Sequence, residues 1–422
     1  MRGRLPWVIG VLVAVAIVAA VGGATWLLDD DEDSPDETEL ALATSPVGQS
    51  LPAPSSPAAQ TAAVDELEEF WTVDRVVEAL DNPTPRPEGE GEPEPAPSTP
   101  SGNAPGAGTD AQAEGKEPVV REGTPKAAAG VQRACSQPPL AAPQLGFSYK
   151  RFCYRGRLSA SPARTSGALI FWDDANSDGR VDAGEQGACS ATVAASRNES
   201  VLVTAGHCVV KTAVDTSGQP RWFKSFAFVP SHLVEAFYRA AESQNGSLAQ
   251  FARRNLWFGL PIAGSGLQAA WSPEAWVSAR RFSGDFAAIV MAPRVRGGSR
   301  QTIQDVLGSQ GWDMTGRLTP GSVRLLGYPA DNPFNGRVLF ECRGTSKLVR
   351  IGNDPVPELA VGCDMTGGSS GGPWLVAVDR RGVGKVVSVN SHGPRNIMVG
   401  PRLSSLHIDA MRKAETTTIA AR

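Results

Sequence analysis

The chain has 422 residues, a formal net charge of −4 and six cysteines, and 41% of its residues are hydrophobic. Residues 1–126 carry 7 basic and 23 acidic residues, whereas residues 127–422 carry 33 basic and 21 acidic ones. This asymmetry excludes one uniform globular domain, and the ten tryptophans exclude a wholly disordered chain. The basic residues of the second part are scattered, without a basic helix or an aromatic stacking motif, so no nucleic-acid partner is expected.

The N-terminus begins with an uncharged run of 24 residues, Leu5 to Leu28, preceded by Arg2 and Arg4. A membrane-spanning helix needs about 20 apolar residues, whereas the apolar core of a cleaved signal peptide has about 7–15. We therefore predict a cytoplasmic tip and a transmembrane signal-anchor in residues 1–28, with the remainder outside the cell membrane. Small residues at Gly22 and Ala24 keep open the alternative that this helix is cleaved and the protein is secreted.

Residues 29–130 are predicted to form a disordered, acidic, Pro-rich stalk. Ten prolines lie between residues 82 and 126, where no Leu, Ile or aromatic residue occurs, and such a segment forms no core. Within the stalk, residues 62–81 place apolar side chains at helical spacing, with Asp65 as the expected cap. The spacing predicts a short helix over 62–81, which is marginal in water without a partner surface.

Residues 131–422 are predicted to be an all-β domain. Short β-type runs separated by turn-forming residues are typical of a sandwich or barrel. A helical insertion is expected within 233–251, and a closing helix within 403–412. The expected strands cover residues 169–172, 189–193, 201–203, 226–229, 286–291, 323–326, 338–340 and 386–389.

All six cysteines lie in this basic domain. An even number of cysteines in an exported chain predicts disulfides, but six cysteines allow fifteen pairings. Spacing alone does not choose among these pairings, and no pair shows the CxxC spacing of a metal site. The cysteines are Cys135, Cys153, Cys189, Cys208, Cys342 and Cys363.

Three short motifs carry the chemistry. His207 follows an apolar strand, Asp285 precedes another, and Ser370 stands in the Gly-rich run 367–372. Hydrolysis by a serine needs a hydroxyl that attacks, an imidazole that takes and returns its proton, and a carboxylate that fixes the imidazole tautomer. Glycines around the serine allow the backbone N–H groups of Gly368 and Ser370 to converge on an oxyanion. The order His, Asp, Ser therefore predicts a catalytic triad.

The motifs Thr204-Ala-Gly-His-Cys208, Asp285-Phe-Ala-Ala and Gly368-Ser-Ser-Gly-Gly-Pro373 resemble the signatures of chymotrypsin-like serine peptidases. The sequence around Cys363 to Trp374 is most similar to the bacterial glutamyl-endopeptidase branch. Over residues 135–412 the resemblance implies a double six-stranded antiparallel β-barrel, protein or peptide substrates and no cofactor for catalysis. It also implies the disulfides Cys189–Cys208, Cys342–Cys363 and Cys135–Cys153.

Two features depart from the trypsin-like pattern: the residue Ser369 and the 78-residue spacing between His207 and Asp285, which the expected helical insertion explains. Ser369 stands where those enzymes carry the Asp that receives the new N-terminus on activation, so that mode of activation is doubtful here. The specificity pocket is ambiguous, because Asp364 suggests pairing with a basic substrate side chain while Ser391 and His392 suggest binding of a carboxylate. Structural hydrogen bonding of these residues is an equal alternative, and no cleavage specificity is predicted.

Two other functions compete with the peptidase. A catalytically inactive, calcium-stabilised peptidase fold that binds a partner at the cell surface would not need an intact His, Asp and Ser. An α/β-hydrolase is excluded, because its Asp and His follow the serine and only 52 residues follow Ser370. Residues 70–75 resemble a short element that precedes the catalytic domain of secreted actinobacterial peptidases, so residues 62–81 are a candidate pro-segment.

Residues 174–185 match the twelve-residue EF-hand loop, with Gly179 at its sharp turn. The flanking segments are predicted strands, so we expect a calcium-binding hairpin loop without the helix pair. Its expected role is to stabilise, and the alternative is an acidic solvated turn. The expected ligands are Asp174, Asn176, Asp178, Arg180 through its carbonyl, Asp182 and Glu185.

Overall fold

The computed structural model describes residues 46–48, 56–87, 146–147, 149–243, 248–262, 265–316, 321–352, 354–394 and 396–419. Within these ranges no helix is long and apolar enough to cross a membrane. The predicted signal-anchor in residues 1–28 lies outside the described residues, as does most of the predicted stalk.

An eight-stranded sheet forms the first half of the β structure. Its strands β3 and β4 are buried along their whole length, because the core lies on one side and helices cover the other. This explains why β3 carries a continuous apolar run, Ala168 to Trp172, rather than an alternating one, while β4 also buries the polar residues Gln186, Ser190 and Thr192. In spatial order the sheet comprises β1 (Pro46–Gly48), β12 (Ala270–Pro273), β13 (Ala287–Val290), β5 (Val201–Thr204), β4 (Gln186–Ala194), β3 (Ser166–Trp172), β8 (Lys224–Pro230) and β9 (Trp257–Phe258).

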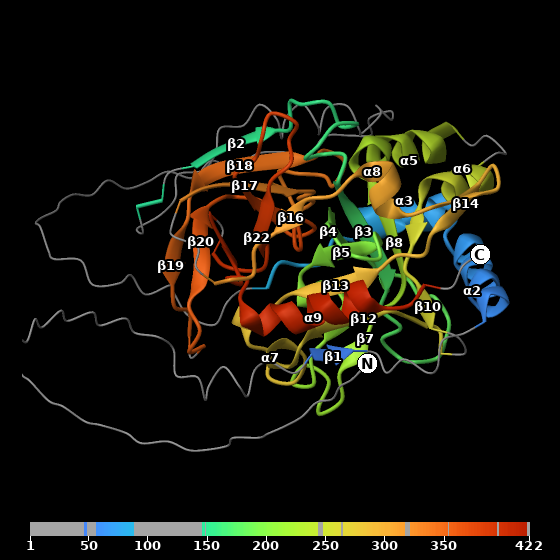
Figure 1. Ribbon diagram of the computed structural model, residues 1–422, viewed down its shortest axis with the longest axis horizontal. Coiled ribbons are helices and arrows are strands. Elements are labelled where there is room, and N and C mark those ends of the chain that lie inside the picture. Colours follow the sequence, from blue (N-terminus) through green and yellow to red (C-terminus); the bar gives the residue numbers. More distant parts are fainter. Residues whose placement is uncertain are drawn as a thin grey trace, which may run out of the picture.

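The second half contains a six-stranded and a three-stranded sheet, and Figure 1 shows its orange strands beside the green strands of the first half. The larger sheet is β16 (Gly311–Trp312), β22 (Lys385–Val389), β21 (Pro373–Val376), β17 (Ser322–Gly327), β18 (Phe340–Thr345) and β2 (Tyr149–Cys153). The smaller is β19 (Lys347–Val349), β20 (Glu358–Gly362) and β23 (Ile397–Gly400).

Three two-stranded ladders complete the described strands: β6 (Val210–Lys211) with β7 (Arg221–Trp222), β10 (Pro261–Ile262) with β11 (Leu267–Gln268), and β14 (Arg294–Arg296) with β15 (Ser299–Gln301). The described chain is thus mostly β, as predicted. The strand numbers differ from the expected six and six, and β16 pairs with β22 in parallel.

Helices lie at the edges of the β structure. The insertion predicted within 233–251 is two helices, α5 (Ser231–Ser243) and α6 (Leu248–Asn255), and the closing helix is α9 (Ser405–Thr416). The remaining turns are short: α7 (Glu274–Val277), α8 (Ile303–Leu307), and the 3₁₀ turns η1 (Gly206–Cys208) and η2 (Phe282–Gly284).

The single helix predicted over 62–81 is wrong in its bounds. The segment forms α2 (Pro57–Phe70) and α3 (Val73–Asp81). The cap of α2 is the hydroxyl of Ser56 rather than Asp65, and Thr72 caps α3 by accepting the N–H of Arg75. A capping residue has non-helical backbone. Thr72 therefore interrupts the helix, although the helical spacing of apolar residues continues across it.

These two helices pack onto the β structure (Figure 1, blue). Helix α3 contacts β3, β4, α5 and α6, and it buries Val73, Val76, Ala79 and Leu80 to 3% exposure or less. Full burial of a Val or Leu side chain contributes about 1.5–3 kcal/mol. Residues 56–87 therefore belong to the folded unit, although the domain boundary expected near residue 130 itself lies outside the described residues.

Candidate active site

His207 and Asp285 meet at one end of the first sheet. His207 lies in η1 directly after β5, and Asp285 directly precedes β13, the strand paired with β5. The imidazole Nδ1 is 2.8 Å from Asp285 Oδ2, and the backbone N–H of His207 donates to Oδ1 at 2.8 Å. The hydroxyl of Ser391 donates a third hydrogen bond to this carboxylate.

The carboxylate of Asp285 is fully buried. Burial by itself raises the pKa of an acid, but the His207 imidazole, the Ser391 hydroxyl and the His207 backbone N–H together hold the pKa of Asp285 below its ordinary value. The group therefore stays ionised near neutral pH. An ionised acceptor at Nδ1 keeps the proton on that nitrogen and leaves Nε2 as a base.

Ser370 is held between Ser190 in β4 and Asn390, the residue that follows β22. Its carbonyl accepts the N–H of Ser190 in β4 at 2.7 Å, and the next N–H, of Gly371, donates to Asn390 O at 2.7 Å. Gly371 has φ +79°, and a Cβ there would collide with the hydroxyl of Thr204, so the turn requires glycine. Among the described residues, Ser370 Oγ and His207 Nε2 are both buried without a hydrogen-bond partner.

The residue before the serine is held by neutral hydrogen bonds. The hydroxyl of Ser369 donates to Thr366 O at 2.6 Å, and its carbonyl accepts from Asn390 Nδ2 at 2.9 Å. Asn390 Oδ1 in turn accepts the indole N–H of Trp374. These contacts fix the loop without the charged group that the trypsin-like pattern carries at this position.

Gly368 lies beside the serine with φ +83°. Its carbonyl accepts the hydroxyl of Ser190 at 2.9 Å, which orients the peptide, and its N–H donates to the carbonyl of Thr84 at 3.1 Å. The N–H group expected to bind an oxyanion is thus already in contact with a carbonyl oxygen.

The three residues of the predicted specificity pocket have other partners. Asp364 is paired with Arg151, and sequence reasoning gave no sign of Arg151 because the two positions are 213 residues apart. His392 is fully buried, its ring stacked on Phe282 at a centroid distance of 4.0 Å. Ser391 bonds Asp285 and lies 3.0 Å from His392 Nδ1.

His392 also faces a second buried acid. Its Nε2 is 3.6 Å from Glu358 Oε2, and both side chains are at most 1% exposed. Burial lowers the pKa of His392 to about 3 and raises the pKa of Glu358 well above its ordinary value, so the neutral forms are favoured. Since the Ser391 hydroxyl donates to Asp285, it accepts from Nδ1–H of His392, which leaves Nε2 facing the protonated Glu358.

Two predicted disulfides are present: Cys189–Cys208, beside His207, and Cys342–Cys363. Cys153 is also disulfide-bonded, and Cys135, its predicted partner, lies outside the described residues. A further histidine, His407 of α9, is structural: its Nε2 lies 2.9 Å from Ser283 O, two residues before Asp285.

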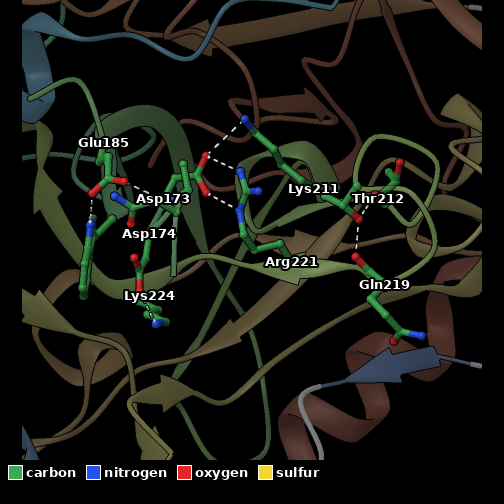
Figure 2. Close-up of polar contacts among 12 residues, drawn as sticks. Asp173, Asp174, Glu185, Lys211, Thr212, Gln219, Arg221 and Lys224 are labelled. Atoms are coloured by element: carbon green, nitrogen blue, oxygen red, sulfur yellow. Dashed lines mark hydrogen bonds and ion pairs between the residues drawn. The ribbon is translucent and has the colours of Figure 1, made fainter. Parts of the chain in front are cut away.

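The predicted calcium loop joins β3 to β4, between the strands as expected. Figure 2 shows Asp174 facing Lys224, whose ammonium lies 2.7 Å from Oδ2. Burial opposes ionisation of Asp174, but the hydrogen bond and charge of Lys224 outweigh it and lower its pKa. Glu185 accepts from the Trp172 indole and from the N–H groups of Ala175 and Asp182.

The loop carboxylates do not converge. Across the described ranges, the one group of three or more His, Cys, Asp or Glu ligand atoms within 4.8 Å is Cys189, His207 and Cys208, and its two cysteines form a disulfide. With Asp174 paired to an ammonium and Glu185 holding three N–H donors, these side chains are arranged as a hydrogen-bonded turn. Calcium binding by 174–185 stays a prediction.

Neither a protein-family model nor a curated protein matches the sequence. Among solved structures, the chain is similar to a thermostable serine protease, AL20, from an extremophilic microorganism: identity is 26%, coverage is 61% of this chain and 99% of that chain, and the TM-score is 0.44. It is also similar to the protease Anisep from Arthrobacter nicotinovorans, with 27% identity, coverage of 61% and 97%, and a TM-score of 0.43.

A third similar structure is a Glu endopeptidase in complex with MPD, with 17% identity, coverage of 63% and 97%, and a TM-score of 0.40. All three similar structures are proteases, the class that the sequence motifs resemble, and one of them is a Glu endopeptidase.

Proposed function

We propose that the chain is a serine endopeptidase in which Ser370, His207 and Asp285 form the triad. The observation that carries this proposal is the buried Asp285, fixed by three hydrogen bonds and aimed at His207 Nδ1. A merely structural His–Asp pair would not need a glycine-rich loop that carries a buried, unpartnered serine hydroxyl. The unpartnered Ser370 Oγ and His207 Nε2 are the two atoms that this chemistry joins.

In the proposed mechanism, Ser370 Oγ attacks the peptide carbonyl carbon while His207 Nε2 takes the hydroxyl proton. The N–H groups of Gly368 and Ser370 stabilise the oxyanion. The C–N bond then breaks, and the imidazolium gives its proton to the leaving amine. Water attacks the acyl-enzyme with His207 again as base, which releases the carboxylic acid and restores Ser370.

The competing function is an inactive peptidase fold that binds a partner. A fluorophosphonate probe, which phosphonylates activated serines, separates the two. We expect labelling of the full-length protein that disappears in Ser370→Ala and His207→Ala, with circular dichroism showing that both variants fold. Absence of labelling in the folded parent protein and also in the folded Arg86→Ala variant would favour the binding module.

We further propose that residues 5–28 anchor the protein and that the catalytic domain is extracytoplasmic. The 24-residue uncharged run supports the anchor, and the disulfides Cys189–Cys208 and Cys342–Cys363 support an oxidising compartment. Protease digestion of intact cells tests the orientation. Degradation only after cell lysis would contradict it, and recovery of a shortened protein in the medium would support cleavage instead.

Calcium binding by the 174–185 loop is a separate proposal, in which Asp174, Asn176, Asp178, Asp182, Glu185 and the Arg180 carbonyl would hold the ion. Because the Lys224 ammonium is paired with the Asp174 carboxylate, calcium must displace that ammonium to bind. We expect Lys224→Met to bind calcium more tightly than the parent in isothermal titration. If neither protein binds in the millimolar range, the proposal fails.

A further inference from the structure

The segment that follows α3 runs into the candidate active site. Ala188 in β4 donates its N–H to Asn82 O at 3.2 Å and accepts the N–H of Thr84 at 2.9 Å, so Pro83 pairs with Ala188 in parallel. Ala188 directly precedes Cys189, which is disulfide-bonded to the neighbour of His207. Residues 82–84 are therefore held by an isolated β-bridge at the edge of the site.

Thr84 in this segment occupies one of the N–H groups proposed to bind the oxyanion. The Thr84 carbonyl accepts the N–H of Gly368 at 3.1 Å, the same N–H that the proposed mechanism assigns to the oxyanion. A Cβ built on Gly368 would lie 3.2 Å from Pro83 Cβ, and one on Gly367 would lie 2.9 Å from Thr84 O. Backbone therefore lies against backbone along this loop, and a substrate carbonyl cannot reach the Gly368 N–H while Thr84 is in place.

Arg86 continues the contact across the predicted specificity pocket. Its Nη1 donates to Met365 O at 2.8 Å, and its Nη2 donates to Pro394 O at 2.8 Å. Met365 follows Asp364, and Pro394 lies two residues after His392. The guanidinium thus bridges the two chain segments that were predicted to line the pocket, where a substrate side chain would enter.

Residues at the end of α2, at the end of α3 and at the start of the segment anchor it to the rest of the fold. The indole N–H of Trp71 donates to Ser225 O at 2.6 Å, and Tyr238 OH donates to Asp81 Oδ1 at 3.0 Å. Asn82 Nδ2 donates to Gly184 O at 3.0 Å. With α3 fixed in the core, residues 82–86 are held at the site at a high effective concentration.

We propose that residues 82–86 are an intramolecular inhibitor that occupies the substrate-binding side of the active site, with Thr84 O at the oxyanion donor and Arg86 across the specificity pocket. The proposal rests on the peptidase function proposed above. Substrate binding then requires residues 82–86 to leave Gly368, Met365 and Pro394. The group that displaces Arg86 has to donate hydrogen bonds to the carbonyl oxygens that Arg86 releases.

Two substitutions in the full-length protein test the inhibitor, and neither changes a triad residue. Arg86→Ala removes both charged hydrogen bonds, and Thr84→Pro removes the N–H that pairs with Ala188. Arg75→Ala is the matched control, because Arg75 lies on the same segment but donates to Phe70 O. The readouts are the rate of fluorophosphonate labelling of Ser370 and the hydrolysis of a peptide library.

We expect Arg86→Ala to raise the labelling rate by about tenfold, because losing two partly exposed charged hydrogen bonds shifts the equilibrium toward the open site by about that factor. Arg75→Ala is expected to label at the rate of the parent. Equal labelling of all four proteins would overturn the inhibitor while leaving the peptidase intact. Absence of labelling in every folded variant would overturn the peptidase proposal and the inhibitor with it. Faster labelling of Arg75→Ala as well would also overturn it, because general loosening of the helices would then be the cause.

Discussion

Arg151 of β2 and Asp364 form a buried ion pair, in which Nε lies 3.0 Å from Oδ1 and the side chains are 2% and 3% exposed. The guanidinium also lies over the rings of Phe334 and Phe340, at 5.1 and 5.6 Å from their centroids. The negative charge of Asp364 is therefore matched inside the protein. An acidic residue at this position does not by itself make a pocket for basic side chains.

Asp364→Ala is expected to destabilise the fold by about 3–5 kcal/mol, because it leaves the Arg151 charge buried without its partner. Urea unfolding followed by tryptophan fluorescence measures this. The control is Asp409→Ala, which breaks an exposed pair with Arg412 and is expected to leave the midpoint almost unchanged. The double variant Arg151→Met/Asp364→Leu should recover much of the loss, and a failure to recover would argue against the ion pair as the cause.

Asp285→Asn should lower kcat by about 10³–10⁴ with little change in KM, because the amide no longer fixes the proton on His207 Nδ1. Ser391→Ala should cost far less, since two hydrogen bonds to Asp285 remain. Steady-state hydrolysis of the best peptide found by library profiling gives both constants. Equal losses in the two variants would mean that the carboxylate charge is not what matters.

The stability of the protein should fall in mild acid because of His392 and His407. Burial lowers the pKa of these histidines to about 3 and about 4, so both are neutral in the folded protein. The unfolded chain binds protons below its ordinary histidine pKa of about 6.5, which favours unfolding. Each group should therefore remove about 1.4 kcal/mol per pH unit between pH 6.5 and its folded pKa.

Denaturant unfolding at pH 7, 6 and 5 measures that slope. His407→Gln should show a shallower decline than the parent, whatever its absolute stability. All other titrating groups are common to the two proteins. Identical slopes of the unfolding free energy against pH would therefore contradict the role assigned to His407.

Glu358 should act in the opposite direction. Burial is the main reason that its pKa is raised well above the ordinary value, so the folded protein keeps a proton that the unfolded chain releases. Stability is then lost as pH rises from the unfolded pKa of about 4.3 to the folded pKa. Glu358→Gln removes this cost. The free energy of unfolding of the variant minus that of the parent should therefore be larger at pH 8 than at pH 4. A constant difference across this range would show that Glu358 is ionised in the fold.

The sequence was most informative where chemistry is encoded by neighbouring residues. Gly371 is required by a local collision with Thr204, and His207 follows its strand directly, so both appear as short motifs. Strands β3 and β5 carry continuous apolar runs because both of their faces are buried, and these runs make them recognisable in the sequence. The apparent single helix over 62–81 was misplaced, since the Thr72 cap lies inside an unbroken apolar repeat.

The parts that could not be predicted depend on distant backbone contacts. Thr84 reaches Gly368 through its backbone carbonyl, which every residue type possesses, and Arg86 donates to the backbone carbonyl of Met365. Because the acceptor is a backbone group in both contacts, and the donor is one as well in the first, no pair of complementary side chains marks this contact in the sequence. The prolines at 83, 85 and 87 also made this segment look like an unstructured linker. The pairing of Arg151 with Asp364 was hidden in the same way by its separation in sequence.

The packing of α3 against β4 has a consequence for how the protein can be made. Residues 88–145 of the chain, here called the tether, join residues 56–87 to the strands β3 and β4 on which α3 packs. Since Val76 and Ala79 are completely buried against the sheet, affinity between the two pieces resides in the interface rather than in the tether. We expect two separately produced polypeptides, split within the tether, to reassemble into one folded protein.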